Sequence, residues 1–162
     1  MPTLTDRQYS KKNIADIASK IRQEYFSTEN PMDGLLNIIK SNRGILEVSF
    51  GVPKETLRIR GDESFVITIP ANTSPLRDVF TIAHELGHYY LHSDQRTPES
   101  FNRDGTNQRE TEANWFAAEL LMPAEKFKKT AEELQNDPQK IAAKFGVSGA
   151  AARVRMSVLG LI

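Results

Sequence analysis

Residues 74–92 read Ser-Pro-Leu-Arg-Asp-Val-Phe-Thr-Ile-Ala-His-Glu-Leu-Gly-His-Tyr-Tyr-Leu-His, and this stretch decides how the rest of the chain is interpreted. Ser74 suits a helix N-cap, and Pro75 suits the first helical position, where its missing N–H is not needed. The apolar residues recur at helical spacing and predict one buried face: Val79, Ile82, Ala83, Leu86 and Tyr90. We therefore expect one amphipathic helix here.

This helix carries the pattern His-Glu-x-x-His at residues 84–88. His84 and His88 are one turn apart and opposite the apolar stripe, so we expect both on the polar face. Two such imidazoles can converge on one Zn²⁺, and Glu85 is angled to reach a water bound to that ion. The alternative is that the histidines are ordinary solvated side chains. The motif and its helical context favour a zinc-dependent hydrolase with one zinc ion per chain.

Composition narrows the class of protein. The chain has 162 residues, 21 Lys and Arg, 21 Asp and Glu, and no Cys. Its balanced charge gives no global attraction to nucleic acid or to an anionic membrane. The lack of cysteine excludes thiolate zinc ligands and disulfides. No apolar run is long enough to cross a bilayer, and the start lacks a signal-peptide core, so we expect a cytoplasmic protein.

The remaining periodicity predicts an α+β fold that is mainly helical. Three period-two segments, at 45–50, 57–60 and 65–69, are interpreted as a small three-stranded antiparallel sheet packed on the motif helix. Residues 93–109 hold one apolar residue and are interpreted as a loop, either a flap beside the site or a solvated connector. The expected helices are 10–26, one beginning at Asn30-Pro31, 110–121, 126–135, 139–145 and one from Ser148 to Val158.

This pattern suggests two parts of the chain. Residues 1–129 are expected to form the domain that carries the metal motif, and the family resemblance described below implies that it is a zincin-like metallopeptidase domain. Residues 130–162 are expected to form a helical, helix-turn-helix-like subdomain packed on it. The four cations of residues 138–162 raise the alternative of DNA binding. However, Gly149-Ala150-Ala151-Ala152 presents few side chains able to read bases, so a packing or partner-docking role is favoured.

A catalytic zinc site usually takes three protein ligands, so one more donor is needed. His92 is two turns from His84, too far along the helix axis to share the ion. Glu110 is the preferred third ligand because it lies along the edge of the buried stripe of the next helix, and Glu112 is the second choice. Asn114 is placed to hydrogen-bond the outer nitrogen of a ligand imidazole.

Two blocks of sequence together resemble the ImmA/IrrE family of zinc metallopeptidases. The first is Phe80-Thr81-Ile82-Ala83-His84-Glu85-Leu86-Gly87-His88-Tyr89, and the second runs from Glu110 through Ala113-Asn114 to Leu121-Met122-Pro123. The resemblance implies that His84 and His88 are zinc ligands, that Glu85 is the general base, and that Glu110 or Glu112 completes the site. Tyr89, Tyr90, His92 and Arg77 are all near, but sequence alone selects none of them as an oxyanion-stabilising residue.

The resemblance also implies an activity and a partner. It implies site-specific cleavage of a regulatory protein, such as a helix-turn-helix repressor or antitoxin of a phage, mobile element or stress regulon. An extended substrate is expected to add to a free edge of the small sheet. The alternative function is a DNA- or repressor-binding regulatory module whose peptidase activity is absent or latent.

Overall fold

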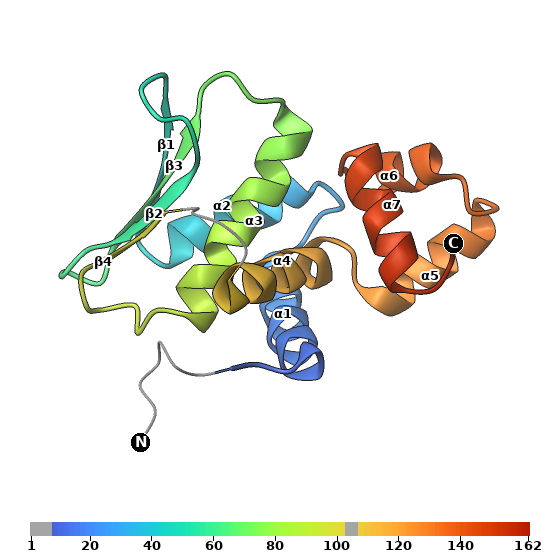
Figure 1. Cartoon of the computed structure of the whole chain (residues 1–162), viewed down its shortest axis with the longest axis horizontal. Helices are drawn as coiled ribbons and strands as arrows, with labels where there is room; N and C mark the ends of the chain where they lie inside the picture. Colours follow the sequence, from blue (N-terminus) through green and yellow to red (C-terminus); the bar gives the residue numbers. More distant parts are fainter. Residues whose placement is uncertain (1–7, 103–106) are drawn as a thin grey trace.

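The structure is a computed structural model that describes residues 8–102 and 107–162. Its described part is mainly helical, as expected, with one small sheet (Figure 1). The helices are α1 Lys11–Tyr25, α2 Pro31–Ser41, α3 Pro75–Leu91, α4 Gln108–Leu121, α5 Ala124–Glu133, α6 Pro138–Phe145 and α7 Gly149–Val158. The strands are β1 Gly44–Ser49, β2 Thr56–Ile59, β3 Phe65–Pro70 and β4 Glu99–Asn102.

The sheet differs from the expected antiparallel sheet of three strands. It has four strands in the order β1-β3-β2-β4, and β1 runs parallel to β3. The other two pairs, β2 with β3 and β2 with β4, are antiparallel. The physical reason lies in β3, where Phe65, Val66, Ile67 and Ile69 are all buried. A nearly continuous apolar run of this kind suits an inner strand, so β3 separates β1 from β2.

The expectation that residues 93–109 form a loop is wrong at β4. Phe101 lies opposite Leu57 and Ser100 opposite Arg58 in the antiparallel register with β2. A segment with a single apolar residue shows no period-two pattern, because its strand conformation comes from pairing with β2 rather than from its own sequence. Residues 103–106 of the expected loop lie outside the described residues.

Helix α3 packs between the sheet and α4, so it is covered on both faces (Figure 1). The expected polar face is therefore not exposed: His84 is 0% and His88 3% accessible to solvent. Gly87 makes the close approach of α4 feasible, since a Cβ at this position would lie only 3.1 Å from the Ala113 Cα. The apolar stripe predicted from sequence does face the core, where Ile82, Ala83 and Leu86 are fully buried.

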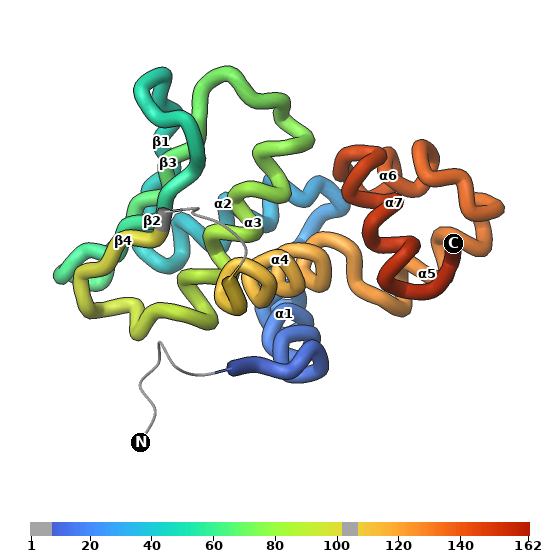
Figure 2. The backbone as a smooth tube through the Cα atoms, in the orientation of Figure 1, coloured from blue at the N-terminus to red at the C-terminus, as the bar shows by residue number. Residues whose placement is uncertain are grey.

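The three C-terminal helices lie at the opposite end of the molecule from the sheet (Figure 2). Asp137 caps α6, Gly146 ends it in the left-handed conformation, and Ser148 caps α7. The expected boundary between residues 129 and 130 falls inside α5, and the division into two parts stays a prediction. Among the described residues, no helix has the length and apolar character that a membrane span requires.

Candidate metal centre

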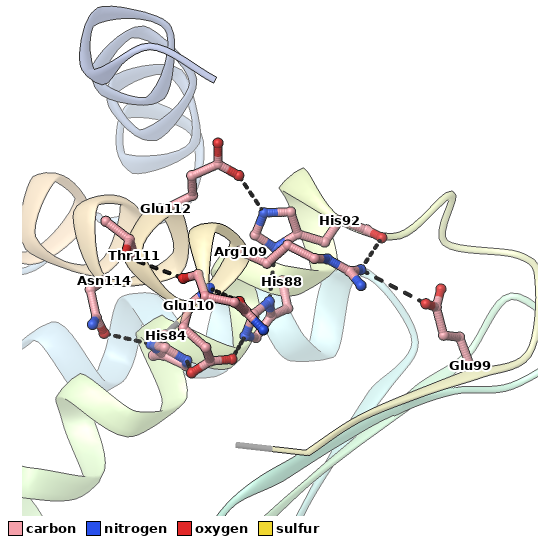
Figure 3. Close-up of polar contacts among 10 residues, drawn as sticks. His84, His88, His92, Glu99, Arg109, Glu110, Thr111, Glu112 and Asn114 are labelled. Carbon is pink, nitrogen blue, oxygen red and sulfur yellow. Dashed lines mark hydrogen bonds and ion pairs between the residues drawn. The ribbon is translucent and has the colours of Figure 1, made fainter. Parts of the chain in front are cut away.

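Three buried side chains from two helices converge on one point (Figure 3). His84 and His88 come from α3, and Glu110 comes from the first turn of α4. The Nε2 atom of His84 lies 3.1 Å from Glu110 Oε2, and that of His88 lies 2.8 Å from Glu110 Oε1. Their donor atoms all fall within 4.8 Å of one another. The chain therefore presents two imidazoles and a carboxylate to a common position.

The N-cap of α4 fixes where Glu110 sits. Asn107 precedes the helix, and its side-chain oxygen accepts a hydrogen bond of 3.0 Å from the Glu110 backbone N–H. This contact sets the first turn of α4, and the close crossing at Gly87 sets its distance from α3. Glu112 lies on the other side of the same turn, and its carboxylate reaches His92 instead of the metal donors.

Asn114 orients the His84 ring. Its Oδ1 lies 2.7 Å from His84 Nδ1. An amide oxygen can only accept, so Nδ1 carries the proton and Nε2 keeps its lone pair. That lone pair faces Glu110 and the point of convergence. The hydrogen bond thus selects the tautomer that binds a metal through Nε2.

His88 is oriented by a longer chain of contacts. Its Nδ1 lies 2.8 Å from the Nδ1 of His92, whose Nε2 lies 2.8 Å from Glu112 Oε1. The carboxylate accepts from His92 Nε2–H, which leaves His92 Nδ1 to accept from His88 Nδ1–H. His88 Nε2 then keeps its lone pair for a metal. His92 is buried and acts on the site through His88, consistent with its exclusion as a direct ligand.

The chain of contacts continues into the N-terminal segment. The second oxygen of Glu112 accepts from the Tyr9 backbone N–H at 2.7 Å, and the Tyr9 hydroxyl donates to the Leu91 carbonyl. Gln108 adds a further hydrogen bond to the same carboxylate oxygen at 3.2 Å. Both oxygens of this buried carboxylate therefore have partners, which is the condition for burying such a group without a large penalty.

Burial favours the neutral forms of His88 and His92. It lowers the pKa of His88, against the opposing effect of Glu110, and it lowers the pKa of His92 to about 4. Burial raises the pKa of Glu110, but the contacts with His84 and His88 outweigh this effect and hold the pKa below its ordinary value. A neutral imidazole and an ionised carboxylate are the forms that bind a divalent metal.

Comparison with protein families assigns the chain to one of them. The family model for the IrrE N-terminal-like domain (Peptidase_M78) matches residues 41–157, which is more than half of the chain. The chain belongs to this family. The matched region contains α3 and α4, the two helices that supply the donors of the IrrE N-terminal-like domain described here.

A solved structure shares the fold of this IrrE N-terminal-like domain. It is a Mycobacterium tuberculosis transcriptional regulator, with a TM-score of 0.65 and 19% sequence identity. The alignment covers 89% of this chain and 46% of that chain, so the present sequence spans less than half the length of the regulator. A comparison with curated proteins gave no match.

Two neighbours of the candidate site were not identified from sequence. The Phe101 ring of β4 stacks on the His88 ring, with centroids 5.3 Å apart and an angle of 18° between the planes. The Arg109 guanidinium lies over the Phe101 ring, 4.8 Å from its centroid, and donates a hydrogen bond to the His92 carbonyl. The only available signal was that Phe101 is the single apolar residue between positions 93 and 109.

The remaining sequence candidates lie in different places. Glu85 is buried beside the donors on α3, at 1% exposure. Tyr89 packs against Phe65, and Tyr90 stacks on Phe116. Arg77 is exposed on the first turn of α3. No single oxyanion-stabilising residue follows from these placements.

The chemistry of the donor set fits a zinc ion. Two histidines and one glutamate, with outer-nitrogen partners on both imidazoles, are the ligand chemistry of zinc peptidases, in which a fourth position serves water or substrate. The three donors are buried where α3 and α4 of the IrrE N-terminal-like domain meet. They form a candidate metal site.

Proposed function

We propose that this chain is a zinc-dependent endopeptidase that makes a site-specific cut in a regulatory protein. One observation carries the proposal: the Glu110 carboxylate meets the Nε2 atoms of both motif histidines at 3.1 and 2.8 Å in a buried site. In this proposal His84, His88 and Glu110 hold one Zn²⁺. Family membership in a peptidase group supports the reaction class.

In the proposed mechanism the zinc ion is the Lewis acid and Glu85 is the general base. When bound, zinc supplies Lewis acidity that activates water and polarises the scissile carbonyl. Glu85 accepts the proton of the attacking water and delivers it to the leaving amine. Asn114 and His92 keep the two ligand imidazoles in the tautomer that binds through Nε2. Burial of the site excludes bulk water and strengthens these interactions.

The proposed substrate is a helix-turn-helix repressor or antitoxin of a phage, mobile element or stress regulon, cut in the cytoplasm. The match to a regulatory-type family and the structural likeness to a transcriptional regulator support a regulatory role. The outer strand β4 carries Phe101 against His88, which supports backbone pairing of an extended substrate at this edge. In the proposed division, residues 1–129 carry the chemistry and residues 130–162 form the C-terminal subdomain.

The position of one cation in the C-terminal residues is relevant to the alternative function of DNA binding. Arg155, counted from sequence as a potential DNA contact, is buried and paired with Glu119 at 3.1 Å. That pairing removes one of the four cations of residues 138–162 from the surface, which favours a packing role for α7.

The test uses Glu85→Gln in the zinc-loaded full chain, incubated with the purified regulator encoded beside it. The wild-type protein should release a discrete fragment. Glu85→Gln should bind zinc with wild-type stoichiometry but cut at least about 100-fold more slowly, since general-base catalysis contributes about 10²–10⁴-fold. Equal rates in the two proteins would disprove the mechanism. Tight binding of the regulator without any cleavage by wild type would favour the latent-peptidase alternative.

A further inference from the structure

A groove of about 760 Å³ opens between α3, α4 and α7, next to the candidate metal centre. This volume falls within the range of about 300–1,000 Å³ that is typical of binding sites. Most of its lining is apolar: Phe80, Trp115, Met122, Ala151, Val154 and Val158. The three metal donors are not among the residues that line it, so the groove is a surface distinct from the donor cluster.

A buried arginine connects two walls of the groove. The Arg155 side chain of α7 donates through Nε to the Met122 carbonyl at 3.0 Å and forms an ion pair with Glu119 of α4. Because Arg155 is 4% exposed, this contact is well shielded from water. The small residues Ala150 and Ala151 line the groove from the first turn of α7, before Arg155, and their side chains occupy little of its volume.

The groove reaches the back of the metal centre. Asn114 lines it and also contacts His84 Nδ1 at 2.7 Å. Thr81 lines it one turn before His84, and Thr111 follows Glu110 directly. A polypeptide seated in the groove would therefore lie immediately beside the catalytic residues.

The walls of the groove indicate the conformation of its occupant. All three are helices, whose interior backbone N–H and C=O groups are already bonded within each helix. An extended peptide would find no strand edge here and would bury unpaired amides. A helix satisfies its own backbone and presents apolar side chains in one stripe, which is the helix-in-groove mode of recognition.

Charge at the rim indicates the polar residues of the occupant. Lys11 and Arg77 are exposed at the groove, and Lys11 Nζ lies 5.1 Å from the Trp115 ring centroid. Within residues 8–102 and 107–162, neither cation forms an ion pair, whereas Arg155 is matched by Glu119. The lining thus has two cations in excess, which complement carboxylates beside an apolar stripe.

We propose that the groove docks an acidic amphipathic helix of the protein substrate and so presents the adjoining segment to the metal centre. The identification of the occupant as the substrate rests on the proposed function. The docking itself does not require cleavage and is measured without it.

The test uses the full-length protein and Trp115, the only tryptophan of the chain, as a fluorescent reporter within the groove. Three synthetic helical peptides without tryptophan are titrated. The first has leucines at i, i+3, i+4 and i+7 with glutamates beside them, the second has lysines in place of the glutamates, and the third has the composition of the first with the leucines scrambled. The first should shift the Trp115 emission and bind at least about tenfold more tightly than the other two, with a preference over the lysine peptide that weakens at high salt.

Two valines of matched exposure provide the variant and its control. Val154 of α7 is 65% exposed and lines the groove, whereas Val48 of β1 is 62% exposed and lies on the sheet. Val154→Asp should weaken binding of the glutamate peptide about tenfold, because it places a carboxylate in an apolar wall facing an acidic ligand. Val48→Asp should leave it unchanged. Arg77→Glu should reduce the preference for the glutamate peptide over the lysine peptide.

Several results would overturn the docking proposal. The first is binding of the scrambled peptide as tight as that of the glutamate peptide, and the second is an undiminished affinity of Val154→Asp for the glutamate peptide. The third is a wild-type dimer that Val154→Asp converts into a monomer in sedimentation, which would make the groove a contact between two copies of the chain. Peptide binding by a zinc-loaded wild-type protein that does not cut the regulator would leave docking intact and count only against the peptidase. Cleavage of the regulator with an unchanged KM in Val154→Asp would count only against docking.

Discussion

The Nδ1 atoms of His88 and His92 lie 2.8 Å apart, and this contact connects a candidate metal ligand to a buried carboxylate that never touches the metal position. Glu112 fixes the tautomer of His92, and His92 in turn fixes that of His88. The two glutamates of one helical turn therefore have different roles: Glu110 faces the donors and Glu112 faces the residue behind them.

The two roles predict a graded series of metal affinities. Glu112→Gln should weaken zinc binding about 10–100-fold, the usual effect of losing an outer partner of a ligand histidine. The reason is that a glutamine amide cannot accept from both His92 and the Tyr9 N–H. Glu110→Gln should weaken zinc binding more, because it removes a donor. Competition with a chromophoric chelator measures both constants.

The exposed Glu133→Gln on α5 is the control for loss of a carboxylate and should bind zinc like wild type. Circular dichroism on each variant separates loss of metal from loss of fold. If Glu112→Gln binds zinc as tightly as Glu133→Gln, the proposed orienting role of the His92–Glu112 pair is wrong.

Gly87→Ala should destabilise the crossing of α3 and α4. The added Cβ would lie 3.1 Å from Ala113 Cα and 3.2 Å from the Ala113 carbonyl oxygen, and backbone atoms cannot rotate away. Overpacking costs about 1–3 kcal/mol, whereas alanine in a helix gains about 1 kcal/mol over glycine. We expect a net loss of up to about 2 kcal/mol in urea unfolding, with weaker zinc binding as α4 and Glu110 move outward.

Gly51→Ala is the matched control, because its Cβ would meet only the Ser49 hydroxyl at 3.8 Å. Its free energy of unfolding should stay within about 0.5 kcal/mol of wild type, as for an ordinary surface substitution. If Gly87→Ala is as stable as Gly51→Ala and binds zinc with unaltered affinity, the crossing of α3 and α4 can accommodate a methyl group and the prediction is wrong.

Asp94 should titrate far below an ordinary aspartate. Its side chain accepts from the Thr97 hydroxyl and from the backbone N–H groups of Thr97 and Arg96, and these bonds lower its pKa to about 2. A depressed carboxyl pKa contributes stability above the unfolded value of about 3.9, and this contribution is lost as pH falls through 2. An NMR titration of the carboxyl carbon measures it.

Thr97→Val removes the hydroxyl donor and should move the Asp94 pKa back up toward its ordinary range. Thr28→Val, whose hydroxyl bonds Asp33 instead, serves as the control and should leave Asp94 unchanged. If Thr97→Val leaves the Asp94 pKa unchanged, the hydrogen bond from the Thr97 hydroxyl is not what lowers that pKa.

Local signals in the sequence predicted the helices well. Asn30, Ser74 and Ser148 cap the helices that follow them, as short polar side chains before apolar periodicity suggest. The convergence of His84, His88 and Glu110 also matches the spacing argument, although the ligand assignment itself stays a prediction. These features depend on residues a few positions apart or on one amphipathic face.

What sequence reasoning missed depends on contacts between distant segments. The parallel pairing of β1 with β3 joins residues about twenty positions apart, and nothing local encodes it. The burial of His84 and His88 comes from α4, which a helical wheel of α3 cannot include. The strand at Phe101 is likewise specified by Leu57 on its partner, so a single apolar residue gave too little signal.

The length of helix α4 has a consequence for the evolution of such a protein. Its first turn holds Glu110, and its last turns hold Glu119 and the Met122 carbonyl that anchor α7. Its 14 residues separate the two ends by about 20 Å. Substitutions in the wall formed by α7 therefore leave the distances between the metal donors untouched. Under the proposed roles, a lineage could exchange one target for another while its hydrolytic apparatus stayed constant.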